Sequence, residues 1–153
     1  MLDVLPVIPL FDGLSPKQIS TLTALFEGFS SPAHKVIFEQ GEPPEYLYLI
    51  LKGSASIVFK PYDAPQIKIT QLKEGDVFGW SAVIGGKKYT SSAVSETDIE
   101  AIRIHRRSLL TLLADDPETG KIIIDRLALN VSPRWKNAHQ QIQQYLHPER
   151  KKP

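Results

Sequence analysis

Residues 75–93 read GDVFGWSAVIGGKKYTSSA, and the organisation of the whole chain is easiest to understand from this stretch. It begins as a strand that ends at Phe78, turns sharply at Gly79 and continues as a short helical turn over Trp80–Ile84. Such a turn presents backbone N–H groups at the positive end of a helix dipole, which suits a phosphate or a carboxylate. Alternatively, the glycines only mark turns between strands. The local residues leave both interpretations open.

Length and composition indicate one globular domain. The chain has 153 residues, of which 42% are hydrophobic and 23% charged, as is typical of a domain with a single core. The net charge of +1 argues against an extended nucleic-acid surface, and the absence of cysteine excludes disulfides and thiolate metal sites. No apolar run approaches the ~20 residues of a membrane span, and the N-terminus lacks the basic region of a signal peptide. We therefore expect a cytoplasmic protein without a nucleic-acid or membrane partner.

The N-terminal part carries the signature of a helix start. Ser15 is a candidate N-cap, Pro16 suits the first helical position and Gln18 completes a capping box. Apolar residues then recur at helical spacing, and we expect this helix to end near Gly28.

From Val36 onward the hydrophobic period becomes that of strands. Short runs rich in β-branched and aromatic residues are separated by turn signals such as Gln40–Pro44 and Lys60–Pro65. Their regular spacing predicts an antiparallel sandwich or barrel. Besides the strand ending at Phe78, the expected strands are Val36–Phe38, Tyr46–Leu51, Ser54–Phe59, Ile67–Leu72, Thr90–Val94 and Ile99–Ile104.

After Arg107 the period returns to that of helices. A brief helix is expected over Ser108–Leu113, and Asp115–Pro117 marks the start of another, with an aspartate cap and a proline in the first turn. An apolar stripe continues from there to Tyr145, although Pro133 either bends this helix or divides it into two. The stripe either packs on the β unit or faces a second copy of the chain. The candidate residues of a dimer interface are Trp135, Ala138, Ile142 and Tyr145.

This order of elements resembles the cyclic-nucleotide-binding domain family, as found in catabolite activator protein, kinase regulatory subunits and gated channels. The segments that carry the resemblance are Val36–Gly41, Tyr46–Gly53, Leu72–Gly79 and Thr97–Ile102. The resemblance implies a mainly β fold with flanking helices: an eight-stranded double-stranded β-helix (jelly roll) with an N-terminal helix and C-terminal helices. We expect a single domain over residues 1–146, with a helical N-terminus over 1–30, a β-roll over 31–107 and C-terminal helices over 108–146. Residues 147–153 are expected to be a disordered tail.

The family's phosphate-binding cassette corresponds to Gly79–Ser92, and there the sequence departs from the family at both charged positions. The resemblance implies a glutamate after the Phe-Gly pair, which holds the ribose, and an arginine ten residues after that glycine, which pairs with the cyclic phosphate. This chain has Trp80 and Tyr89 at these positions. Lys87 and Lys88 are candidates to replace the arginine, but an ammonium group lacks its planar fork. We therefore predict that cAMP and cGMP do not bind tightly.

Three functions stay open at this point. The main prediction is a non-catalytic ligand-sensing or regulatory module, in which Trp80 and Tyr89 line a changed pocket for another small-molecule effector. The alternative is a genuine cyclic-nucleotide-binding regulatory protein, and the second alternative is a ligand-free interaction scaffold whose old pocket these two side chains fill. We expect no cofactor, a separate output protein and a candidate homodimer. The candidate ligand-binding residues are Phe78, Gly79, Trp80, Ser81, Ala82, Lys88, Tyr89, Thr90 and Ser91.

The remaining motifs do not indicate catalysis. The four histidines lie apart, without the spacing of metal ligands, so neither a metal site nor a catalytic residue is expected. Gly79–Val83 imitates the first half of a nucleophile elbow but lacks the second glycine. Arg103, His105, Arg106 and Arg107 suggest a solvated strand end and helix start, or alternatively a patch that contacts phosphate. The chain is therefore expected not to be an enzyme.

Overall fold

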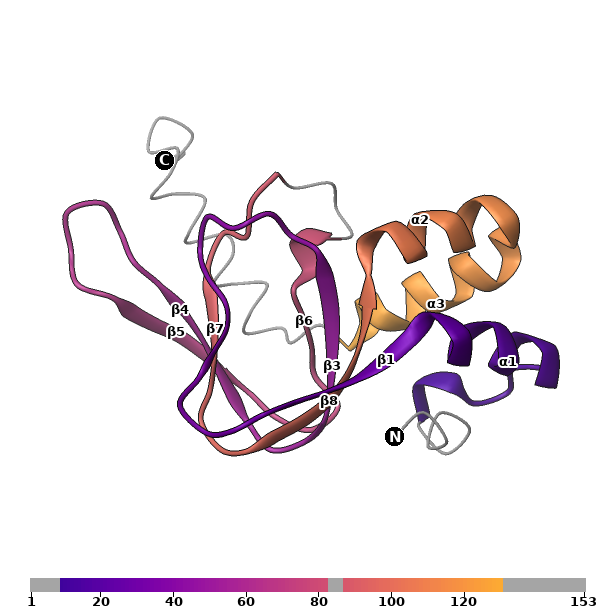
Figure 1. The fold of residues 1–153 in the computed structure, drawn as a ribbon, viewed down its shortest axis with the longest axis horizontal. Helices are drawn as coiled ribbons and strands as arrows, with labels where there is room; N and C mark the ends of the chain where they lie inside the picture. Colours follow the sequence, from indigo (N-terminus) through magenta and orange to yellow (C-terminus); the bar gives the residue numbers. More distant parts are fainter. Residues whose placement is uncertain (1–8, 83–86, 131–153) are drawn as a thin grey trace, which may run out of the picture.

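The computed structural model describes residues 9–82 and 87–130, and its central part is a β unit of two four-stranded sheets. The strand orders are β1-β8-β3-β6 and β2-β7-β4-β5, and every pairing is antiparallel (Figure 1). This arrangement confirms the mainly β jelly roll with flanking helices. The strands are β1 Phe26–Ser31, β2 Val36–Phe38, β3 Tyr46–Lys52, β4 Ala55–Phe59, β5 Ile67–Leu72, β6 Val77–Phe78, β7 Ser92–Ser95 and β8 Ile99–His105.

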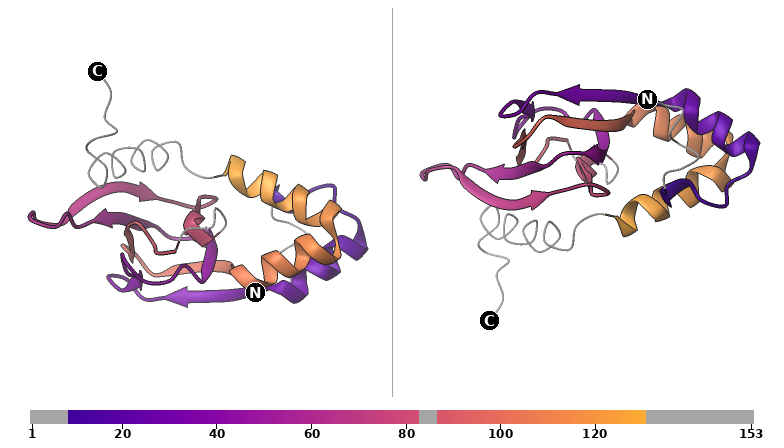
Figure 2. Two further views of the ribbon diagram at one scale, coloured as in Figure 1. Left: turned by 90° about the horizontal axis from the view of Figure 1, so that it is seen from above. Right: turned by 90° about the horizontal axis from the view of Figure 1, so that it is seen from below.

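The helices gather at one end of the β unit. Figures 1 and 2 show α1, α2 and α3 together at this end, whereas the β4–β5 hairpin projects from the opposite end. None of the helices in the described ranges is both long and apolar enough to cross a bilayer. The helices are η2 Pro9–Phe11, α1 Pro16–Leu25, η3 Trp80–Ala82, α2 Arg106–Asp115 and α3 Pro117–Leu129, of which η2 and η3 are short 3₁₀ helices.

The predicted helix caps are confirmed. The Ser15 hydroxyl accepts a hydrogen bond from Gln18 N at 3.1 Å, and Gln18 Oε1 accepts one from Ser15 N at 2.9 Å, which is the capping box. At α3 the cap is Asp116, whose Oδ1 accepts from Thr119 N at 3.2 Å. The helix α2 begins earlier than predicted because His105 caps it: Nδ1 accepts from Arg107 N at 3.0 Å.

The predicted end of α1 is wrong by three residues. The helix ends at Leu25, and Phe26–Ser31 pairs with β8 as an edge strand, so the expected helical N-terminus over 1–30 stops short. Phe26 is 3% exposed and packs edge-on against Phe11, with ring centroids 5.6 Å apart. The strand forms by pairing with β8, whose residues lie 68 to 78 positions later in the sequence, and local helical spacing does not reveal such a pairing.

One hydrophobic cluster joins both sheets to the helices. Leu22 of α1, Ile57 of β4, Ile102 of β8 and Ile123 of α3 are all at most 1% exposed and belong to this cluster. The N-terminal segment is tied to it, because Arg126 Nη1 donates to the carbonyl oxygens of Leu10 at 3.0 Å and Asp12 at 2.6 Å. The dimer candidates Trp135, Ala138, Ile142 and Tyr145, the effect of Pro133 and the tail over 147–153 lie outside the described residues.

Candidate functional site

The turn at Gly79 determines how the cassette begins. Gly79 has a φ of +83°, a conformation that favours glycine, and a Cβ at this position would lie 2.7 Å from the carbonyl oxygen of Tyr46. Both the backbone conformation and the close contact therefore disfavour a side chain here. The following 3₁₀ helix η3 covers only Trp80–Ala82, shorter than the predicted helical turn, whose further residues are not described. The N–H of Ala82, predicted to face a ligand, donates to the carbonyl oxygen of Gly79 at 3.0 Å. That N–H therefore closes the turn.

Tyr89 occupies the position that the resemblance assigns to the phosphate-binding arginine, and its side chain is 5% exposed. The hydroxyl donates to the carbonyl oxygen of Tyr46 at 2.7 Å and accepts from the N–H of Tyr46 at 3.1 Å. Burial raises the pKa of the Tyr89 phenol far above its ordinary value, so the group is neutral at physiological pH. In this predicted ligand-binding residue the proton of the hydroxyl is therefore already bonded within the protein.

The ring of Tyr89 belongs to an aromatic cluster inside the β unit. It stacks on Phe38 with centroids 3.7 Å apart and an interplanar angle of 12°. Phe38 also contacts Tyr48 at 5.9 Å and Phe78 at 6.0 Å, and Tyr48 stacks on Phe78 at 4.8 Å. The structure therefore brings the predicted site residues Phe78 and Tyr89 into one cluster of four packed rings.

The backbone around Tyr89 is fixed to the turn after β2. Gly41 N donates to the carbonyl oxygen of Tyr89 at 2.9 Å, and Tyr89 N donates to the carbonyl oxygen of Glu42 at 2.8 Å. The hydroxyl of Ser92 accepts from Gln40 N at 2.8 Å. These bonds pin the segment that begins β7, so the strand runs over Ser92–Ser95 and not over the predicted Thr90–Val94.

The other predicted site residues lie in different environments. Lys88, like Lys87, is exposed, and the buried Tyr89 follows it directly. Trp80 is half-buried and packs against the core cluster, Thr90 is half-buried, and Ser91 is 4% exposed. The side chain of Ser81 is not described. The exposed lysines do not supply the cation that an arginine at position 89 would place inside the fold.

Sequence reasoning missed one polar group inside the β unit. Thr70 of β5 pairs across from Ile57, a core residue, and is 6% exposed. Its Oγ1 has no hydrogen-bond partner among the residues that the structure describes. A buried hydroxyl without a hydrogen-bond partner lowers the stability of the fold, and such groups are uncommon in folded proteins. Alternation along Ile67–Leu72 assigns Thr70 to the same face as the exposed Lys68, so no local signal marked it as buried; its burial accompanies the register shift between β4 and β5 at Ile57 and Val58.

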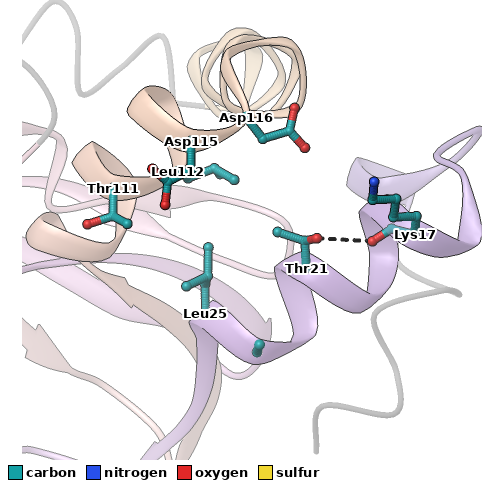
Figure 3. A pocket seen from close by; sticks show the side chains of 8 residues that line it. Lys17, Thr21, Leu25, Thr111, Leu112, Asp115 and Asp116 are labelled. Atoms are coloured by element: carbon teal, nitrogen blue, oxygen red, sulfur yellow. Dashed lines mark hydrogen bonds between the residues drawn. The ribbon is translucent and has the colours of Figure 1, made fainter.

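A hollow of about 560 Å³ lies away from the cassette, between α1 and α2 (Figure 3). Two hydrogen bonds from Thr119, helped by nearby Lys17, hold the pKa of Asp116 below its ordinary value. Asp116 is thus already used as the cap of α3. The hollow shares no residue with the cassette; its lining consists of Lys17, Thr21, Ala24, Leu25, Thr111, Leu112, Asp115 and Asp116.

The comparison with known families decides the affiliation. The family model of the cyclic nucleotide-binding domain matches residues 29–116, more than half of the chain. This chain belongs to the cyclic nucleotide-binding domain family. The match covers all eight strands except the first residues of β1, together with the cassette and α2.

Proteins named as regulators are among those similar to this chain. The chain is 29% identical over 126 residues to a CRP-like cAMP-activated global transcriptional regulator of Mycobacterium tuberculosis, covering 82% of this chain and 56% of the relative. A cyclic nucleotide-binding domain from Methylobacillus flagellatus has a TM-score of 0.74 at 22% identity, covering 99% of this chain and 83% of that one. The regulatory subunit of a cAMP-independent protein kinase A from Trypanosoma cruzi, bound to guanosine, has a TM-score of 0.71 at 18% identity, covering 93% and 49%. The two structural likenesses establish the fold.

Proposed function

We propose that this chain is a non-catalytic regulatory module of the cyclic nucleotide-binding superfamily that does not bind cAMP or cGMP tightly. The observation that supports this is the pair of hydrogen bonds between the Tyr89 hydroxyl and the main chain of Tyr46. They engage the hydroxyl of the residue at the position that the resemblance assigns to the family's phosphate-binding arginine. A buried neutral phenol in that place offers no positive charge to an anion.

The expected loss of affinity is large. A hydrogen bond to a charged group contributes about 1.5–3 kcal/mol, and two such contacts, those of the family's glutamate and arginine, are missing at Trp80 and Tyr89. Together they correspond to a roughly 10²–10⁴-fold weaker complex, so a micromolar site becomes a millimolar one.

Calorimetric titration of the full chain with cAMP and with cGMP, up to millimolar nucleotide at low salt, tests this function. We expect no saturable heat at micromolar nucleotide. A dissociation constant in the micromolar range for either nucleotide would overturn the proposal and favour the genuine cyclic-nucleotide binder.

A charge-restoring variant sharpens the test. Trp80→Glu combined with Tyr89→Arg puts back both charged contacts, and we expect cAMP to raise the melting temperature of this variant but not of the natural chain. The matched control is the double variant Trp80→Gln with Tyr89→Gln, which restores no charge. Its melting temperature is measured with and without cAMP in the same way. Circular dichroism verifies that each variant is folded before the comparison is made.

A second candidate function is the recognition of a neutral heterocycle, and Thr70 favours it. Its buried hydroxyl, which has no hydrogen-bond partner within the described part of the chain, can hydrogen-bond a ligand that carries no phosphate. The guanosine in the T. cruzi regulatory subunit is such an uncharged ligand. Titration with guanosine and adenosine tests the idea. Binding that Thr70→Val weakens at least tenfold supports it, and no binding of either nucleoside rejects it.

The separate output protein, the homodimer and the absence of a nucleic-acid partner stay predictions.

A further inference from the structure

Arg103 lies in a stack of aromatic side chains, and this environment corrects the prediction that it is solvated. Its guanidinium carbon is 3.9 Å from the ring centroid of Tyr46 and 5.0 Å from that of Phe29. Its Nε donates to Glu27 Oε1 at 2.7 Å. The guanidinium is thus held between two rings and one carboxylate, contributed by three strands that are neighbours in one sheet, β1, β8 and β3.

The stack is rigid because each ring has a second partner. Phe29 meets the ring of Tyr48 edge-on at 5.3 Å, and Tyr46 meets the ring of His105 edge-on at 5.0 Å. The main chain of Tyr46 is fixed in turn by the Tyr89 hydroxyl. A surface whose side chains are already immobilised loses little conformational entropy when a partner binds.

The stack is also accessible. The side chain of Arg103 is 25% exposed and that of Glu27 is 50% exposed, and both Phe29 and Tyr46 are half-buried. We call this surface, made of Phe29, Tyr46 and Arg103, the arginine platform. Tyrosine, phenylalanine and arginine are enriched at protein interfaces, and tyrosine and arginine among the residues that carry most binding energy.

Three arginines lie close together in the sequence at and beside the arginine platform. Arg103, Arg106 and Arg107 lie on β8 and the first turn of α2, opposed by Glu27 and Glu45. Glu27 accepts one hydrogen bond from Arg103 Nε, and the Tyr48 hydroxyl is a further hydrogen-bond partner of the guanidinium, which has five N–H donors in all. Arg107 is exposed.

We propose that the arginine platform is a docking surface for an acidic segment of a partner protein. Carboxylates of the partner bind Arg103 and Arg107, and an apolar side chain packs on the exposed parts of Phe29 and Tyr46. The proposal deepens the regulatory role proposed above, since a regulatory module acts through a partner, and it names the chemistry of that partner.

Fluorescence anisotropy on the full chain tests the docking. The probe is a labelled heptapeptide of alternating aspartate and phenylalanine, and its counterpart of alternating lysine and phenylalanine is the control. We expect the acidic peptide to bind and 0.5 M salt to weaken it, and we expect Arg103→Ala to weaken it at least tenfold. Lys68→Ala is the matched variant, since Lys68 is likewise ion-paired, at 2.6 Å to Glu96, but lies in the other sheet.

Two further variants separate docking from folding. Arg107→Ala removes an exposed charge, and we expect a loss of affinity with an unchanged melting temperature. Arg103→Lys keeps the charge but not the planar stack, and we expect it to lose most of the affinity.

Several outcomes overturn the proposal. The first is that Arg103→Ala and the natural chain bind the acidic peptide equally well, and the second is that the acidic peptide does not bind at all. The third is that a single-stranded oligonucleotide displaces the peptide, which would make the surface a general polyanion site. None of these outcomes depends on the nucleotide titration, so the two proposals can fail independently.

Discussion

At the scale of single residues, Tyr89 has a structural role, and the proposed function gives it a second one. Its hydroxyl satisfies both main-chain groups of Tyr46, and its ring stacks on Phe38. The same contacts that fill the position of an anion-binding arginine therefore stabilise the fold.

We expect Tyr89→Phe to lower the free energy of unfolding by about 1–3 kcal/mol, because the buried N–H and carbonyl of Tyr46 lose their partner while the ring stays. Urea denaturation followed by circular dichroism measures the change. Tyr62→Phe is the control, since Tyr62 is 96% exposed and its hydroxyl should contribute nothing. Equal stability of both variants would contradict the role assigned to the Tyr89 hydroxyl.

A second residue-scale prediction concerns the turn before η3. Gly79→Ala places a Cβ 2.7 Å from the carbonyl oxygen of Tyr46, whereas Gly41→Ala, at a similar φ of +92°, meets nothing within 4 Å. Both variants pay backbone strain of about 1–2 kcal/mol, and only the first adds a collision. We expect Gly79→Ala to be clearly the less stable of the two in thermal melts; matching melting temperatures would mean that the turn relaxes freely.

At the scale of elements, a network around Glu96 holds β4 and β5 to the turn that follows β7. The carboxylate accepts hydrogen bonds from Lys68 Nζ at 2.6 Å and Gln71 Nε2 at 2.7 Å, and also from the Ser56 hydroxyl. The bonds from Lys68 and then Ser56 are the main reasons why the pKa of Glu96 lies below its ordinary value.

The sign of the resulting pH dependence is fixed by this lowered pKa. The stabilising contribution is present above the ordinary value of 4.5 and is lost as the pH falls through the lower value of the folded state. We expect the natural chain to lose more stability between about pH 5 and pH 3 than Glu96→Gln does, as measured by urea denaturation at each pH. Glu74→Gln, at an exposed position, should lose as much stability over this pH range as the natural chain does. If Glu96→Gln also lost as much stability as the natural chain, the role assigned to the Glu96 network would be wrong.

The adjacent aspartates between α2 and α3 provide another element-scale comparison. Asp116 accepts from both the N–H and the hydroxyl of Thr119, and Gln18 of the α1 capping box donates to that same hydroxyl at 3.1 Å. We expect Asp116→Ala to lower the melting temperature, because α3 loses its cap and the Thr119 hydroxyl, which accepts from Gln18, loses its own acceptor. Asp115→Ala, one residue earlier in an exposed position, should leave the melting temperature unchanged.

Elements with local signals were predictable from the sequence, and elements defined by distant partners were not. The caps at Ser15 and Asp116 depend on residues three positions away, so the pattern alone located them. The strand β1 depends on pairing with β8, which no local pattern reveals, and the helical spacing before it therefore extended too far.

At the scale of the whole molecule, one core connects both sheets and the helices, which predicts a single unfolding transition. Residues of α1, α3 and both sheets share the hydrophobic cluster, and Trp80 packs against it. In a Trp135→Phe variant, Trp80 is the sole indole, and we expect its fluorescence and the far-ultraviolet circular dichroism to give coincident urea midpoints. Separate midpoints would mean that the cassette opens independently of the core.

The candidate site was less predictable than the fold. The missing charges at positions 80 and 89 are visible in the sequence, and they suffice to predict weak nucleotide binding. The sequence could not distinguish a tyrosine that lines a pocket from one that fills it, because the distinction depends on the Tyr46 main chain and the Phe38 ring, brought there by folding. The unpartnered Thr70 and the stacked Arg103 likewise depend on strand register.

The hydrogen bonds of Tyr89 also constrain how such a protein can change over evolutionary time. A single substitution of Tyr89 by arginine would remove the ring stack and both bonds to Tyr46, and would bury a charge before any ligand is present to neutralise it. The intermediate is thus less stable, and this loss offsets the affinity that one restored charged contact would contribute. A return to an anion site that begins at position 89 therefore passes through a destabilised intermediate.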